Sequence, residues 1–106
     1  MDALGFQIET KPTLEPWRTV LLDAADYIEK HGLMQGGGGC GKNGERCAGV
    51  AIVEARERLG EGTSEAMRCF TNFMGFSSTV DIPRWNDTPG RTASEVIAAL
   101  RECARS

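Results

Sequence analysis

Residues 92–104 read TASEVIAALRECA, and this stretch decides the fold class. Thr92 and Glu95 stand three positions apart, the spacing of a capping box, in which each side chain bonds the other residue's backbone N–H at the start of a helix. Apolar residues then recur at helical spacing, at Val96, Ile97, Leu100 and Cys103. The pattern predicts a helix over roughly 93–104.

Three earlier segments show the same helical spacing of apolar residues. The first and third begin near a Thr or Ser, which favour a helix start, and all three end at a glycine, which favours a helix stop. The predicted start and stop residues are Thr13 and Gly32, Cys47 and Gly60, and Thr63 or Ser64 and Gly75. The first of these helices is expected over roughly 14–31. The sequence therefore predicts four helices in all.

The remaining segments lack helical spacing. Residues 76–91 contain two prolines and the turn string NDTPG, so we expect an irregular connection with a brief extended piece at Val80–Ile82. Residues 1–12 show no sustained period and are expected to form an N-terminal arm. A short edge strand at Phe6–Ile8 is compatible with that arm.

Length and composition agree with one compact domain. A chain of 106 residues is too short for two cores, and its 41% hydrophobic and 25% charged residues are typical of an ordinary globular protein. The predicted fold class is mainly α, a single domain over 1–106 with four helices. We expect a flexible glycine-rich loop over 36–46 between the first two helices, with room for a minor β pairing.

Net charge and the spacing of the cysteines indicate which kinds of partner and which cellular compartment to expect. The 12 basic and 15 acidic residues give a net charge of −3, which disfavours nucleic acid as a partner. No apolar stretch approaches the ~18 residues of a membrane span, and the N-terminus lacks a basic leader before an apolar run. The four cysteines lack the close pairs of a disulfide scaffold. We therefore expect a soluble cytoplasmic protein with reduced thiols.

The string GGGGCGKN, residues 36–43, looks like a nucleotide-binding loop but fails several of its requirements. It matches GxxxxGK from Gly36 to Lys42, yet Asn43 stands where a Ser or Thr hydroxyl would reach magnesium. The string also follows a predicted helix, whereas a P-loop follows a strand and opens directly into a helix. A flexible connection is the favoured interpretation, and nucleotide or anion binding by 36–43 is a third-ranked function.

The sharpest enzymatic hypothesis uses Cys47. The free N–H groups and the dipole at a helix start favour a thiolate, and His31 with Asn86 or Asp87 would complete a Cys-His-Asn arrangement. Nothing in the sequence brings these groups together, so we favour a structural role for Cys47 as a small apolar residue. The spacing from Cys40 to Cys47 is too open for structural zinc, and no metal site is predicted.

Residues 85–92 join a large aromatic residue, a polar turn and a capped helix. On the structural interpretation, Asn86 or Asp87 bonds the backbone two residues further on and sets the direction of the last helix, while Trp85 fills the edge of the core. On the functional interpretation, Trp85 and Arg91 face a partner, because tryptophan and arginine are enriched at binding hot spots. Trp85, Asn86, Asp87 and Arg91 are therefore the candidate binding residues.

Two longer stretches, LLDAADYIEKHGLMQG (21–36) and IPRWNDTPGRTASEVIAALRECA (82–104), resemble a family of small uncharacterised proteins of actinobacteria and their bacteriophages. Its members carry A-A-x-x-I/L-E-x-x-G-W-x-Q-G, then C-x-x-G-A-I/L, then W-N-D-x-P-G-R-T-x-x-E-V-I/L. This chain departs from the pattern at Leu33, where the family usually has Trp, and at Gly49, which comes one residue early after the cysteine. The resemblance implies a domain of unknown function and supplies no catalytic residues.

The leading hypothesis is a small accessory or regulatory protein, phage-encoded on the strength of the resemblance, that binds another protein and performs no chemistry of its own. The alternative is a small cysteine-dependent hydrolase or transferase that uses Cys47 and His31. The expected partner is a protein, namely a host protein if the chain is phage-encoded, and a homo-oligomer is compatible with the sequence. No cofactor, metal or membrane is expected.

Overall fold

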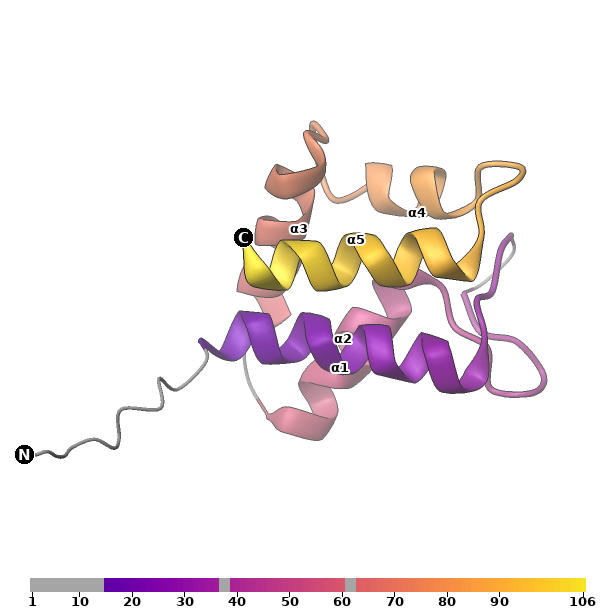
Figure 1. Cartoon of the computed structure of the whole chain (residues 1–106), viewed down its shortest axis with the longest axis horizontal. Coiled ribbons are helices and arrows are strands. Elements are labelled where there is room, and N and C mark those ends of the chain that lie inside the picture. The colour runs from indigo at the N-terminus through magenta and orange to yellow at the C-terminus, as the bar shows by residue number, and fades with distance from the viewer. Residues whose placement is uncertain (1–14, 37–38, 61–62) are drawn as a thin grey trace, which may run out of the picture.

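The structure is a computed structural model that describes residues 15–36, 39–60 and 63–106, and these residues form five helices (Figure 1). The mainly helical class is confirmed, with one helix more than the predicted four. The N-terminal arm, with its predicted strand at Phe6–Ile8, lies outside the described residues. In chain order the helices are α1 (Pro16–His31), α2 (Ala48–Leu59), α3 (Thr63–Met74), α4 (Asp81–Asn86) and α5 (Ala93–Arg105).

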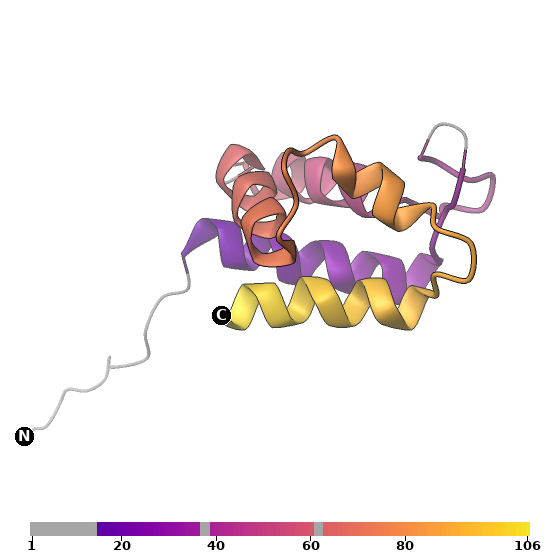
Figure 2. The same cartoon turned by 90° about the horizontal axis from the view of Figure 1, so that it is seen from above.

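The helices form two layers. Helices α1 and α5 lie side by side and antiparallel in one layer, while α2, α3 and α4 make up the other (Figures 1 and 2). Helix α1 is the centre of the fold, because it packs against α5, α2 and α3. The core lies between the layers. Its fully buried large apolar side chains come from all five helices: Val20, Leu21, Ile28, Ile52, Phe70, Ile82, Val96 and Leu100.

The ends of the helices follow from local chemistry. Helix α1 begins at Pro16, where the missing N–H would have had no partner, and its N-cap is Glu15 rather than the predicted Thr13. The capping box of Thr92 and Glu95 is present at the start of α5, with both of its hydrogen bonds formed. Cys47 precedes α2 as its N-cap. The last-helix prediction is thus confirmed to within one residue at its end.

Helix α4 corrects the irregular connection expected over 76–91. Val80 has helical dihedral angles (φ −62°, ψ −25°), so the expected extended piece at Val80–Ile82 is wrong. Pro83 is the third residue of the helix, within the first turn, where no N–H is needed for the helical ladder. Ile82 is fully buried against the core, and this tertiary contact is absent from the local pattern.

The minor β pairing amounts to two isolated bridges. Leu33 pairs with Arg46 in parallel, and Cys40 pairs with Arg46 in antiparallel fashion. In the part of the chain that the structure describes, these bridges belong to no strand or sheet. They hold the segment after α1 against the segment before α2.

Candidate functional site

Asn86, at the end of α4, is the centre of a hydrogen-bond network that joins three segments. It is fully buried, and its Oδ1 accepts the backbone N–H of Ala48 at 2.9 Å. Its Nδ2 donates to the carbonyl oxygen of Met34 at 2.9 Å. One buried amide therefore satisfies a donor at the start of α2 and an acceptor in the segment after α1. These contacts hold the end of α4, the start of α2 and residues 33–36 together.

Asp87 and Gln35 extend this network toward the glycine-rich segment. The Asp87 Oδ1 accepts the backbone N–H of Gly36 at 2.9 Å and the Asn86 amide at 3.0 Å. Gln35 donates through Nε2 to the carbonyl oxygens of Asn86 and Thr88, at 3.0 and 3.1 Å. The Gly36 N–H, followed by the Asn86 amide, lowers the pKa of the Asp87 carboxyl below its ordinary value of 3.8.

Trp85 and Arg91 form a second set of contacts, with α3 and the residues after it. The Trp85 ring lies edge-on to Phe70, with centroids 5.8 Å apart, and tilted against Phe76 at 6.3 Å. The Arg91 guanidinium covers the indole at 4.8 Å, and its Nε donates to the Trp85 carbonyl oxygen at 3.0 Å. Trp85 is half-buried at the core edge, and both side chains are used within the fold.

These contacts correct one local expectation. We expected the Asn86 or Asp87 side chain to bond the backbone two residues further on. Instead Asn86 bonds Ala48, 38 residues earlier, and Asp87 bonds Gly36, 51 residues earlier. Sequence spacing indicates only partners a few residues away, so it could not predict these tertiary hydrogen bonds. Three of the four candidate binding residues, Asn86, Asp87 and Trp85, thus hold the fold together through long-range contacts.

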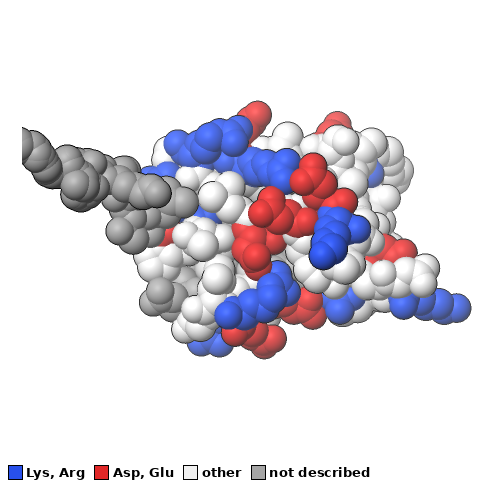
Figure 3. Space-filling view, turned by 60° about the horizontal axis from the view of Figure 1, so that its bottom comes forward, with Lys and Arg blue, Asp and Glu red and all other residues white. Residues whose placement is uncertain are grey.

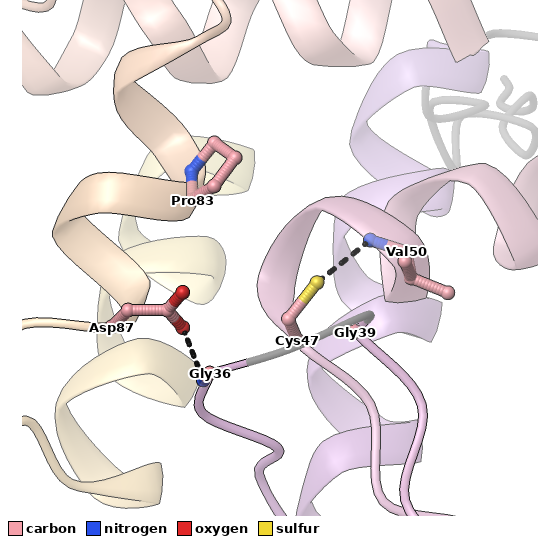
Figure 4. A pocket seen from close by; sticks show the side chains of 6 residues that line it. All are labelled: Gly36, Gly39, Cys47, Val50, Pro83 and Asp87. Atoms are coloured by element: carbon pink, nitrogen blue, oxygen red, sulfur yellow. Dashed lines mark hydrogen bonds between the residues drawn. The ribbon is translucent and has the colours of Figure 1, made fainter.

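A half-open pocket lies where this network meets the start of α2 (Figure 4). Its volume is about 200 Å³. The walls come from the glycine-rich segment, from α2 with its N-cap, and from α4 with the residue after it. The lining residues are Gly36, Gly39, Cys47, Val50, Pro83 and Asp87.

The wall formed by Cys47 and Gly39 is tightly fitted. The Cys47 Sγ accepts the backbone N–H of Val50 at 3.4 Å, and the Cys47 N–H donates to the Gly39 carbonyl oxygen at 2.9 Å. A Cβ at Gly39 would lie 2.7 Å from Val50 Cγ2 and 3.0 Å from the Cys47 sulfur. Only glycine therefore lets the loop backbone approach α2 this closely.

The structure places Cys47 and His31 in the walls of two different pockets. The His31 ring stacks on Tyr27, with centroids 4.2 Å apart, and lines a different surface pocket that also contains Arg58. The Asn86 side chain already bonds the Ala48 N–H, the Met34 carbonyl oxygen and the Asp87 carboxylate. His31 is the single histidine of the chain, so no other imidazole is available as a base for the thiol.

The glycine-rich segment does not have P-loop geometry in its described residues. Helix α1 precedes it, and α2 begins only at Ala48, six residues after Lys42. The Glu45 carboxylate accepts the Asn43 N–H at 2.9 Å. The N–H groups of Glu45 itself and of Asn43 lower the pKa of that carboxyl. The chain's own carboxylate thus occupies an amide that a phosphate would need.

The described residues offer neither a metal site nor a membrane span. Along the described ranges, no group of three or more His, Cys, Asp or Glu side chains is arranged to hold a metal ion. No helix there has the length and apolar character needed to cross a membrane. Acidic and basic side chains are interspersed on the face shown in Figure 3, so that face presents no single-sign field.

Comparison with known sequences places the chain in a family. Residues 12–106 match the model of the family described as "Family of unknown function (DUF6197)". The chain belongs to this family. Comparison with curated proteins and with solved structures gives no match. Family membership covers all five helices and the pocket, and it assigns no activity to them.

The sequence indicated only part of this site. Cys47 and Asp87 were singled out, and both line the pocket. Val50 and Pro83 were not predicted as site residues. The sequence pattern of an apolar residue on a helix is the same whether the residue lines a pocket or lies in the core. The signal that was present is the glycine at 39, where a side chain would collide with Val50.

Proposed function

We propose that this protein is a small accessory or regulatory protein that acts by binding another protein, and that the pocket of Figure 4 receives one side chain of that partner. The observation that carries the proposal is the pocket itself, with Val50 and Pro83 on its walls and a volume of about 200 Å³. Sites for drug-sized ligands or cofactors usually span roughly 300–1,000 Å³. A cavity of about 150 Å³ holds a molecule the size of benzene. The pocket therefore suits a single side chain.

The walls are held in place before any partner arrives. Asn86 links α4 to α2, Asp87 holds Gly36, and the Cys47 sulfur caps α2. A pocket whose walls are fixed by buried or backbone hydrogen bonds loses little conformational freedom on binding. Such preorganisation supports a binding role, because anchor side chains at interfaces typically enter well-formed pockets.

The second candidate function is a cysteine-dependent hydrolase or transferase. The observation that favours it is that Cys47 lines the same pocket. That function needs a base within hydrogen-bond reach of the thiol. His31 lines another pocket, and the Cys47 sulfur already accepts the Val50 N–H. We therefore give Cys47 the roles of N-cap and pocket wall in the proposed binding function.

The cellular setting is part of the proposal. The motif resemblance to proteins of actinobacteria and their bacteriophages supports a cytoplasmic protein whose partner is a protein of the bacterial host. The net charge of −3 and the mixed charges on the face shown in Figure 3 support a protein partner rather than a nucleic acid.

The test compares two variants of α2 that differ only in whether they reach the pocket. Val50 lines it, whereas Val53, three residues further on and 41% exposed, does not. A host protein captured by the wild type is purified, and its Kd is measured by calorimetry. Val50→Trp is expected to weaken binding about tenfold or more, and Val53→Trp by no more than about twofold.

Two results count against the proposal. One is a partner that binds Val50→Trp as tightly as the wild type. The other is turnover of any substrate that disappears in Cys47→Ser while the far-ultraviolet circular dichroism and Tm stay unchanged. The second result would favour the enzymatic candidate, because serine keeps the N-cap and removes the thiol.

A further inference from the structure

We infer that the side chain received by this pocket is a lysine or an arginine, whose charged end meets Asp87. The inference rests on the proposed function, namely that the pocket holds one side chain of a protein partner. It adds the chemical class of that side chain. The partner surface is accordingly expected to present a basic residue at its centre.

The first argument is the composition of the pocket walls. Two of the six lining residues are glycines, and Val50 and Pro83 provide apolar surface. Asp87 is the lining residue that carries a carboxylate, and no lysine, arginine or histidine lines the pocket. Lysine and arginine side chains match this combination of apolar walls and one carboxylate, because each has an aliphatic stem and a charged end. The stem would lie along the apolar walls and the charge would reach the carboxylate.

The second argument is the bonding state of Asp87. Its Oδ1 accepts from both Gly36 and Asn86, which fixes the carboxylate in position. Within the described residues, no donor is bonded to its Oδ2. The same two donors lower the pKa of the Asp87 carboxyl, so it is ionised at neutral pH. An oriented carboxylate with a free oxygen is a strong acceptor for an ammonium or guanidinium group.

The third argument concerns the neighbouring basic residues. Arg84, in α4, has an 81% exposed side chain, and its Nη1 lies 3.9 Å from the Asp81 Oδ1. Arg91 covers the Trp85 ring. Neither of them lines the pocket, so neither neutralises Asp87 there. An apolar guest would cover this carboxylate without pairing it, which is unfavourable, whereas a cationic guest would pair it.

The test uses small probes in place of the unidentified partner. The probes are n-butylammonium and n-propylguanidinium, which reproduce the lysine and arginine side chains, with 1-butanol as the neutral analogue and butyrate as the anionic one. Binding is followed by the NMR shifts of the Val50 methyl groups and the Gly36 amide, which report on walls from two different segments. In the wild type, a cation is expected to bind about tenfold more tightly than 1-butanol.

Asp87→Asn removes the charge and keeps the shape, so the preference for the cation is expected to disappear while 1-butanol still binds. Glu57→Gln, on an exposed position of α2, is the matched control and should leave the preference intact. The wild type alone supplies a second measurement, because added salt should weaken the binding of the cation and leave 1-butanol unaffected.

The outcomes separate this inference from the proposed function. Equal affinities of the wild type for the cation and for 1-butanol would overturn the inference of a basic side chain. The proposed function would then stand with an apolar side chain in the pocket. A cation preference that survives in Asp87→Asn would also overturn it. If none of the probes shifts the NMR signals of Val50 and Gly36, both the inference and the single-side-chain pocket on which it rests are overturned.

Discussion

The side-chain oxygen of Asn86 accepts the backbone N–H of Ala48 at 2.9 Å, across 38 residues of chain. The donor is the first residue of α2 and the acceptor is the last residue of α4. Four N–H groups at the start of any helix lack partners within it, and a buried one needs a partner elsewhere. Asn86 meets that need from another helix, so it positions α2 in the fold, while Cys47 is the N-cap.

Asn86→Ala is therefore expected to destabilise the protein by about 2–4 kcal/mol, because it leaves the Ala48 N–H and the Met34 carbonyl oxygen without partners in a buried site. Urea unfolding followed by circular dichroism measures the loss. Asn72→Ala, at an exposed position of α3, is the control and should change stability by less than about 0.5 kcal/mol. Similar values for the two variants would refute the role of Asn86.

Two glycine variants test how closely the loop backbone approaches α2. Gly36 and Gly39 both have positive φ, but a Cβ at Gly36 meets nothing within 4 Å, whereas one at Gly39 lies 2.7 Å from Val50 Cγ2. Gly36→Ala should lose about 1–2 kcal/mol from backbone strain alone. Gly39→Ala should lose about 1–3 kcal/mol more, from overpacking. Thermal or urea unfolding compares the two.

The double variant Gly39→Ala with Val50→Ala isolates the collision. Shortening Val50 removes Cγ2, the atom nearest to the new Cβ, so the two substitutions together should be less destabilising than the sum of their separate effects. Additive effects would mean that the loop moves away from α2 without resistance.

Thr92→Ala should destabilise the protein by about 1 kcal/mol, because the Thr92 hydroxyl accepts the Glu95 N–H at the start of α5. Glu95→Gln should have a smaller effect, since an amide oxygen can still accept the Thr92 N–H that the carboxylate now accepts. Ser94→Ala, exposed in the same turn, should be neutral or slightly stabilising. The comparison is made by Tm and urea midpoint, and a neutral Thr92→Ala would contradict it.

Arg18 joins the start of α1 to the end of α5. Its Nη1 donates to the carbonyl oxygens of Ala104 and Ser106, at 2.9 and 2.7 Å, and so places a cation at the C-terminal end of α5. Arg18→Gln should destabilise the protein by about 1 kcal/mol, an effect that salt reduces. Arg84→Gln, with an 81% exposed side chain, should be nearly neutral in the same unfolding assay.

Cys103 links stability to alkaline pH. Burial raises the pKa of its thiol from an ordinary 9.0 to about 11. The folded state favours the neutral thiol, so this contribution to stability is complete below pH 9 and is lost as the pH rises through about 11. Cys103→Ala should flatten the fall in Tm over that window. Exposed Cys40→Ala is the control and should leave the slope unchanged.

Much of the fold was predictable because the start, the end and the apolar face of a helix depend on residues three or four positions apart. The last helix was predicted from the capping box of Thr92 and Glu95, and its N-cap is confirmed. The start of α2 at Cys47 was also predicted within a residue. Helix α4 was missed, because it has six residues, contains Pro83 and is followed by turn residues, a pattern that also fits a loop. Its burial through Ile82 stabilises a helix too short to show a clear period.

The sequence by itself determined the class of this protein: amphipathic stretches with their own start and stop residues, in one small helical domain. Only the tertiary structure decided what the polar residues after Trp85 do, and that Cys47, Val50 and Asp87 line one pocket while His31 lies elsewhere. The physical reason is range. Caps and periodic apolar faces act over three or four residues, whereas the bonds of Asn86 and Asp87 span 38 and 51, and a pocket exists only once distant segments have packed.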